Sequence, residues 1–225
     1  MRSMYRTLDR AVVRDIALVC LADTLVGLSY GAIAVGSGFD PWVPIAMSLL
    51  VLAGASQFLF VGMVAAGASP LAAAAAGLLV NARHLPFGLA VGEAVGPGWR
   101  RVVGSHLMND ETVAFALGQR EREAQRAAYW VCGVAILVAW NAGVLIGALA
   151  GTAIGDTDAL GLDAAFPAVL LALVLPSLRD RGTRHAALAG AAIALAATPV
   201  APAGLPVLLA LAGLLLAGLP RVSRC

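Results

Sequence analysis

The sequence of 225 residues contains no lysine and few charged residues of any kind. Charged residues make up 12% of the chain, whereas soluble proteins carry about 25%. Hydrophobic residues reach 60%, which leaves too little polar surface for a soluble globule. Residues 41–82 and 127–155 hold no charge, and in 185–220 only His185 is titratable. Uncharged apolar runs of roughly 18 or more residues predict an integral membrane protein.

Cysteine is also scarce, and its spacing excludes several kinds of site. The three cysteines, Cys20, Cys132 and Cys225, share no CxxC-type spacing, so the sequence predicts neither a disulfide framework nor a thiolate metal site. A net charge of +2 without a basic, aromatic-rich patch does not favour nucleic-acid binding. No GxxxxGK[ST] sequence occurs, which excludes ATP hydrolysis by that route. We therefore expect no cofactor and no metal.

The turn residues divide the chain into spans of about 20 residues, the length that crosses a bilayer. Asp40-Pro41 and Ser69-Pro70 each place proline after a capping residue and predict helix starts. We expect an all-α, polytopic fold of seven to eight transmembrane helices, some short or broken, in a single transmembrane domain, 1–225. The expected spans are 15–36, 42–66, 70–94, 101–119, 127–151, 161–178, 185–198 and 205–219. The last two are short and can form a re-entrant hairpin instead.

Arginine placement predicts the orientation of these spans. Twelve of the fifteen arginines lie in four segments: the N-terminal lead 1–14, the loops 120–126 and 179–184, and the end 221–224. Because arginine concentrates on the cytoplasmic side, both termini and these loops are predicted to be cytoplasmic. This topology places Arg100 and Arg101 on the opposite side.

Glycine recurs every four residues at positions 143, 147, 151 and 155, and again at 27 and 31. On a helix, such glycines form a smooth stripe that lets a second helix approach closely. We expect internal helix packing at this stripe, with a subunit interface as the alternative.

The expected spans also contain polar side chains, which are costly inside a bilayer and usually face a protein interior or a transport path. Most of them fall in the first four spans, which we therefore expect to line a polar path. These residues are Asp23, Ser56, Gln57, Asn81, Arg83, His84, His106, Asn109, Asp110 and Glu111.

The spacing within this set predicts local geometry. Asn81 and His84 are three residues apart and share a helix face. Pro86 follows, and an interior proline tends to break a helix, as in many transporter substrate sites. His106 and Asp110 are four residues apart, so a carboxylate can neighbour an imidazole that titrates near neutrality and relays protons.

Each of these groups also has a structural interpretation. Asp23 can pair with Arg83, or Arg83 can reach the membrane interface along its flexible stem. Ser56 can hydrogen-bond back to its own helix. The acids of the fourth span, Asp110 and Glu111, can be ordinary charges near a helix end.

Several segments resemble the AzlC family, the large subunits of branched-chain amino acid exporters, in the right order over nearly the whole chain. The matching segments are GASQF (54–58), LVNARH (79–84), NDET (109–112), WNAG (140–143), GLDAAFPA (161–168) and LPVLLA (205–210). The resemblance implies a multi-pass inner-membrane protein that works with a small hydrophobic AzlD-type subunit. It also implies export of valine, leucine, isoleucine and, in some members, methionine.

The resemblance and the polar set together suggest a mechanism. We expect substrate binding by Ser56, Gln57, Phe58, Asn81 and Arg83. Arg83 or a half-helix N-terminus would hold the carboxylate, an acid would hold the ammonium, and the tail would lie against Phe58, Phe87 or Phe115. Uphill export needs coupling, which we expect to be proton antiport through Asp23, His84, His106, Asp110 and Glu111.

Two other classes of function stay open. An intramembrane serine protease would use Ser56 as nucleophile and His84 or His106 as base, although the bulky Gln57 follows the serine. A passive channel would not concentrate a substrate against a gradient. A helper subunit without a site of its own is the other alternative, against which the buried polar set argues.

Overall fold

The computed structural model describes residues 7–153, 171, 175, 177–201, 205–210 and 212–216, and all regular structure in these residues is helical. The predicted all-α fold is therefore confirmed. The span expected at 161–178 and the arginines at 221–224 lie largely or wholly outside the described residues.

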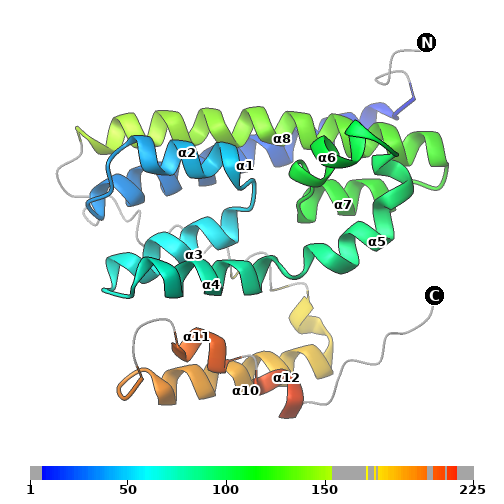
Figure 1. The fold of residues 1–225 in the computed structure, drawn as a ribbon. Coiled ribbons are helices and arrows are strands. Elements are labelled where there is room, and N and C mark those ends of the chain that lie inside the picture. The colour runs from blue at the N-terminus through cyan, green and yellow to red at the C-terminus, as the bar shows by residue number, and fades with distance from the viewer. Residues whose placement is uncertain are drawn as a thin grey trace.

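Two long helices, α1 (Arg10–Gly36) and α8 (Arg122–Gly151), run parallel and side by side (Figure 1). The residue numbers of the contacting pairs increase together along both helices, as in parallel helices: Thr24 contacts Gly143, Leu28 contacts Gly147, and Ala32 contacts Gly151. The backbones touch at these points, because glycine has no side chain to keep the two helices apart. The described part of the glycine stripe therefore packs internally, as expected.

The segment 42–66, predicted as one continuous span, is instead a hairpin of α2 (Trp42–Leu50) and α3 (Gly54–Ala65). Residues 51–53 between the two helices are not helical, and α3 turns back toward the end of α1. Phe60 on α3 packs against Phe39, which follows α1, with ring centroids 6.3 Å apart. The predicted single span is wrong, because the chain enters from one end of the bundle and leaves at the same end.

The third span is broken as the sequence predicts. It comprises α4 (Pro70–Asn81), which Ser69 caps by accepting a hydrogen bond from Ala72 N at 3.2 Å, and α5 (His84–Val95). The two halves are bent by 48°. The break lies just before Pro86, whose ring would clash with the carbonyl of the residue four positions earlier in a continuous helix.

The last turns of α5 reach the opposite end of the bundle, because Glu93 forms an ion pair of 2.8 Å with Arg122 at the start of α8. The side chain of Arg126 also donates a hydrogen bond to the backbone carbonyl of Glu93 at 3.2 Å. The bent pair α4–α5 thus crosses the bundle antiparallel to α1 and α8.

The segment 101–119 is a second hairpin, formed by α6 (Trp99–His106) and α7 (Asp110–Leu117). Tyr129 of α8 donates a hydrogen bond to the carbonyl of Gly104 at 2.8 Å, so α6 runs inward along the first half of α8. Phe115 of α7 packs in the apolar cluster at the beginning of α1 and α8. The predicted single span is wrong here too, because α7 returns to the end from which α6 came.

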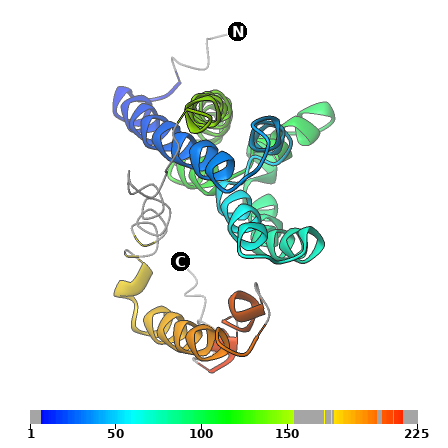
Figure 2. The same cartoon turned by 90° about the vertical axis from the view of Figure 1, so that its left-hand side faces the viewer.

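Residues 10–117 therefore repeat one unit with opposite orientation: a span followed by a hairpin that turns back midway. Figure 2 shows the bundle with α8 seen nearly end on. Among the described residues, two helices, or three if the bent pair counts as one, can cross a membrane by length and composition. The described residues contain fewer spans than the seven to eight expected from sequence. Each hairpin is as long as a span but does not cross the bundle.

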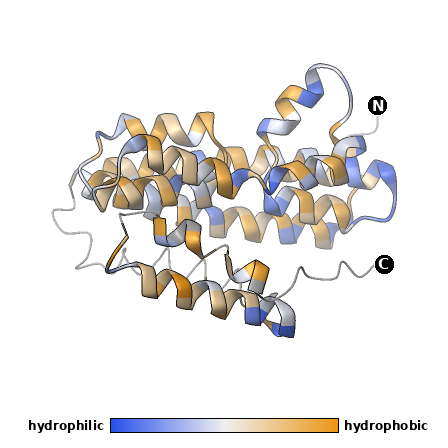
Figure 3. Cartoon of the chain, turned by 60° about the horizontal axis from the view of Figure 1, so that its bottom comes forward, coloured by the Kyte–Doolittle hydropathy of each residue, from blue (hydrophilic) through white to orange (hydrophobic). Residues whose placement is uncertain are grey.

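This arrangement moves Arg100 and Arg101, at the start of α6, to the end where α1 and α8 begin. The expectation that they lie opposite the other arginines is wrong, because the second hairpin does not cross. All arginines of residues 7–153 except Arg83 now lie at one end: Arg10, Arg14, Arg100, Arg101, Arg120, Arg122 and Arg126. Hydrophilic segments gather there in Figure 3. The cytoplasmic orientation of that end stays a prediction from arginine bias.

The helix bounds differ from the expected loops and short spans. α8 begins within 120–126, and α10 (Arg181–Ala197) begins within 179–184, directly after the short η3 (Ser177–Arg179). The piece predicted at 205–219 is divided into α11 (Leu205–Leu209) and α12 (Ala212–Leu216). Both pack on α10, and α12 is close enough for glycine to meet glycine at Gly190 and Gly213.

Candidate functional site

Three chain breaks meet in the middle of the bundle. They lie at 51–53, 82–83 and 107–109, between the two halves of each helix pair. Leu52 and Leu107, at the two hairpin turns, belong to one buried cluster with Tyr30 and Trp140. Polar side chains that the sequence placed in separate spans therefore come together at this level.

The first hairpin turn is held by Gln57, whose side chain is fully buried. Its Nε2 donates to the carbonyl oxygens of Met47 and Val51, and its Oε1 accepts a hydrogen bond of 3.2 Å from Nε1 of Trp140. These two carbonyls also accept backbone hydrogen bonds from the N–H groups of Val51 and Ala53, so the amide adds a second bond to each at the end of α2. This network gives Gln57 a structural role, with both ends of its amide already engaged by the protein.

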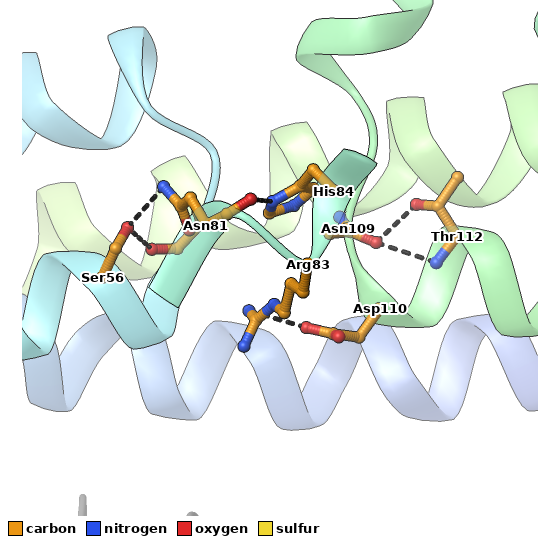
Figure 4. A network of polar contacts seen from close by, with 8 residues as sticks. Ser56, Asn81, Arg83, His84, Asn109, Asp110 and Thr112 are labelled. Atoms are coloured by element: carbon orange, nitrogen blue, oxygen red, sulfur yellow. Dashed lines mark hydrogen bonds and ion pairs between the residues drawn. The ribbon is translucent and has the colours of Figure 1, made fainter. Parts of the chain in front are cut away.

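Ser56 connects the first hairpin to the broken span. Its hydroxyl donates to the carbonyl of Ala53 at 2.9 Å and accepts from Nδ2 of Asn81 at 3.1 Å (Figure 4). Nδ1 of His84 lies 2.9 Å from the backbone carbonyl of Asn81, so the two residues are in contact. They do not share a helix face as predicted, because α4 ends at Asn81 and α5 begins at His84. Oδ1 of Asn81 is buried and has no hydrogen-bond partner.

A second connection is the ion pair between Arg83 and Asp110, with Nη2 and Oδ2 2.8 Å apart (Figure 4). Arg83 lies at the break of the third span, and Asp110 is the first residue of α7. The side chains are 32% and 48% exposed, so the pair is partly open, yet Nε of Arg83 is buried without a partner. Arg83 thus pairs with Asp110, and the suggested ion pair with Asp23 does not form.

Two further carboxyl groups face this centre from neighbouring helices. Asp23 on α1 has one carboxyl oxygen, Oδ2, that is buried and makes no hydrogen bond. Its carboxyl group repels that of Glu111 on α7, which in turn is attracted by Arg83. Asp23 therefore interacts with Glu111, and Glu111 in turn with Asp110 and Arg83.

His106 lies elsewhere than its spacing predicted. It is the last residue of α6, and 107–109 separate it from α7, so it shares no helix face with Asp110. No ion pair joins the two side chains. The expected relay along one helix is wrong, because the hairpin turn falls between its members.

The residues at that turn include two whose role the sequence reasoning missed. Oδ1 of Asn109 accepts hydrogen bonds from the backbone N and the hydroxyl of Thr112, at 2.8 and 2.6 Å, and so caps α7. An asparagine followed by two acidic residues, Asp110 and Glu111, is a helix-start pattern that could have shown the break. The sequence analysis missed this helix start because it assigned residues 101–119 to one continuous span.

Phe58 lies in the buried apolar core of the bundle. Its ring packs edge-on against Tyr30 and Trp140 at centroid distances of 5.1 and 6.5 Å, and its side chain is 5% exposed. Phe87 is half-buried and stacks edge-on with His84 at 5.9 Å. Of the three phenylalanines expected near a substrate tail, Phe87 is thus the one beside the break of the third span.

The arrangement presents both signs of charge and unsatisfied donors and acceptors in one region. Such a set fits a ligand that is itself charged at both ends, since its groups can replace partners that the protein does not supply. Ser56 has no histidine at its hydroxyl, so the geometry of a serine protease is absent from residues 7–153. The described residues hold no cluster of three metal-ligating side chains.

A parallel pair of long helices, a broken span and two opposed half-length hairpins around charged side chains define a membrane protein built from broken helices. The chain belongs to the AzlC family, whose model, described as AzlC protein, matches residues 18–154. All the site residues discussed above lie within this range, whereas the segments 161–168 and 205–210, which the resemblance also included, lie outside it. The family is one of transport proteins rather than enzymes.

Three relatives illustrate this family. An uncharacterized membrane protein of Archaeoglobus fulgidus is 30% identical over 79% of both chains. Inner membrane protein YgaZ of Escherichia coli is 30% identical over 68% of this chain and 62% of its own. Branched-chain amino acid transport protein AzlC of Bacillus subtilis is 25% identical over 76% and 68%. No solved structure matches the chain.

Proposed function

We propose that this protein exports branched-chain amino acids, namely valine, leucine and isoleucine, with methionine as a further candidate, across the cytoplasmic membrane. The family membership and the name of the Bacillus subtilis relative support the substrate class. The name of the Escherichia coli relative supports an inner-membrane location. A small hydrophobic AzlD-type subunit is the expected partner.

The observation that carries the proposal is the partly open Arg83–Asp110 ion pair beside unpartnered polar atoms. An amino acid has a carboxylate and an ammonium group, which together have the same charges as this pair. In the proposed complex the carboxylate binds Arg83, whose guanidinium is suited to paired hydrogen bonds with carboxylates. The ammonium group binds Asp110 or Asp23, and the apolar tail lies against Phe87.

Proton coupling is assigned to the acidic groups around the same centre. Asp23 and Glu111 lie on facing helices and interact electrostatically, so a proton on one changes the field at the other. Asp110 is connected to these acids by its ion pair with Arg83. His84 and His106 are the remaining groups that can carry a proton. Export against a gradient follows if the proton and the substrate bind these acids in alternation.

Efflux of preloaded labelled valine tests the proposal, in cells that lack their own exporters and express this chain with or without a small partner. We expect efflux that needs an intact proton gradient and the partner, and that is lost in Asp110→Asn at normal membrane levels. The matched control is Glu93→Gln, which removes an equally short ion pair whose acid is 75% exposed at the end of the bundle. Surface pairs of this kind contribute little, so efflux should persist.

Other outcomes separate the alternatives. Efflux that never exceeds equilibration would favour a passive channel. Unchanged efflux in Asp110→Asn and Arg83→Ala would favour a helper subunit whose charged centre binds no substrate. Unaltered pH dependence in Asp110→Asn would contradict the coupling assigned to that carboxylate.

A further inference from the structure

A pocket of about 300 Å³ lies at the arginine-rich end of the bundle, between the beginning of α1 and the end of α7. It is lined by Val12, Asp15, Ala114, Phe115, Gly118 and Gln119. Its volume is at the lower end of the range of roughly 300–1,000 Å³ that small-molecule sites occupy. It is therefore large enough for a single small ligand.

The two helices that line the pocket also lead to the central charges. Asp110 is the first residue of α7, and Phe115 lies five positions further, which is about 8 Å along a helix. On α1, Asp15 precedes Asp23 by eight positions, about 12 Å. A ligand in the pocket would thus lie one short helix away from the Arg83–Asp110 pair.

The pocket has the chemistry that an apolar amino acid needs. Val12, Ala114 and the half-buried Phe115 supply an apolar wall. Asp15 contributes a carboxylate to the lining, and this carboxylate is paired at 3.0 Å with Arg14, which is not itself part of the lining.

The backbone of α7 adds a second feature that favours an ammonium group. The helix ends at the pocket, where Gly118 follows its last residue. The last carbonyls of a helix carry partial negative charge and attract cations. The carboxamide of Gln119 lies at the same end and donates to the carbonyl of Phe115 at 3.3 Å.

We propose that this pocket is an outer binding site, where an amino acid with an apolar side chain docks before it reaches Arg83. The inference rests on the export function proposed above and extends it, because it assigns a second place on the substrate path. The pocket opens at the end that the arginine bias places in the cytoplasm, which is the side from which an exporter loads.

Filling the pocket tests the proposal through the kinetics of valine efflux. Ala114→Trp places a large side chain on the lining, whereas Leu117→Trp places it on the same helix at a residue that is 53% exposed and not part of the lining. We expect Ala114→Trp to raise KM about tenfold, or about 1.4 kcal/mol, with an unchanged maximal rate. Leu117→Trp should keep the wild-type KM.

Asp15→Asn provides a second variant that removes charge without adding volume, at an exposed position where misfolding is not expected. It should also raise the KM for valine. Wild-type KM in both Ala114→Trp and Asp15→Asn, with active wild-type protein, would overturn the outer site alone. Absence of valine efflux from the wild type with its partner would overturn the export function and the outer site together.

Discussion

The close packing of α1 on α8 makes a sharp prediction for Gly147. A methyl group there would lie 2.9 Å from Cα of Leu28 and closer still to the carbonyl carbon and oxygen of that residue. Carbon atoms pack at about 3.5–4.0 Å, so the helices would have to separate by about half an ångström or more. Because the obstacle is backbone, no side chain can move aside. We expect Gly147→Ala to cost about 1–3 kcal/mol, as overpacked cores do.

The matched control is Gly62→Ala on α3, where an added methyl group meets no atom within 4 Å. Alanine is the better helix former there by about 0.8–1.0 kcal/mol, so this variant should be at least as stable as the wild type. Thermal unfolding of the purified protein in detergent measures both. At about 2–4 °C per kcal/mol, Gly147→Ala should lower Tm by about 2–12 °C. Equal Tm values for the two variants would refute direct backbone contact between α1 and α8.

Three further predictions concern the hairpins and the C-terminal helices. Gln57→Leu should lower stability by about 1–3 kcal/mol, because it leaves Nε1 of the buried Trp140 without its acceptor. Tyr129→Phe should cost about 0.5–1.5 kcal/mol through its lost bond to Gly104, measured by Tm. The amide of Thr183 donates to Asp180 at 2.7 Å and lowers the pKa of that carboxyl below its usual value. The stabilisation of α10 that this bond supplies is present above the ordinary pKa and is lost as pH falls through the lowered one, which amide hydrogen exchange at Thr183 measures.

Each of these three predictions has a result that would contradict it. Wild-type Tm in Gln57→Leu would contradict the structural role of the amide, and an unchanged Tm in Tyr129→Phe would contradict the inward course of α6. In Asp180→Asn, exchange at Thr183 should no longer respond to acid. A response that persists would show that another group protects this amide.

The membrane class, the helical fold and the polar centre follow from the sequence because they depend on composition and local spacing. The break before Pro86 is an example, since proline acts on the residue four positions earlier in the same chain. The helix start at Ser69-Pro70 is another, because a cap is a contact within one turn. The internal packing of the glycine stripe was also expected, although its partner helix was not identified.

The two hairpins were not predicted, because hydropathy does not distinguish a crossing from a turn at the bilayer centre. Their turns are stabilised by contacts distant in sequence, such as Gln57 with Trp140. The same limit explains the misplacement of His106 relative to Asp110, which assumed one continuous helix. Once the second hairpin is known, the arginine pattern becomes consistent, since Arg100 and Arg101 then join the other arginines.

Ligand competition at the centre tests the central claim most directly, which is that the Arg83–Asp110 pair binds both charged ends of one amino acid. Labelled valine is bound to the purified protein, and three competitors are added in separate titrations. They are unlabelled valine, valinamide, which lacks the carboxylate, and 3-methylbutanoate, which lacks the ammonium group. The account predicts displacement by valine and at least about tenfold weaker displacement by either analogue, or about 1.4 kcal/mol. Valinamide or 3-methylbutanoate that displaces as well as valine would contradict it.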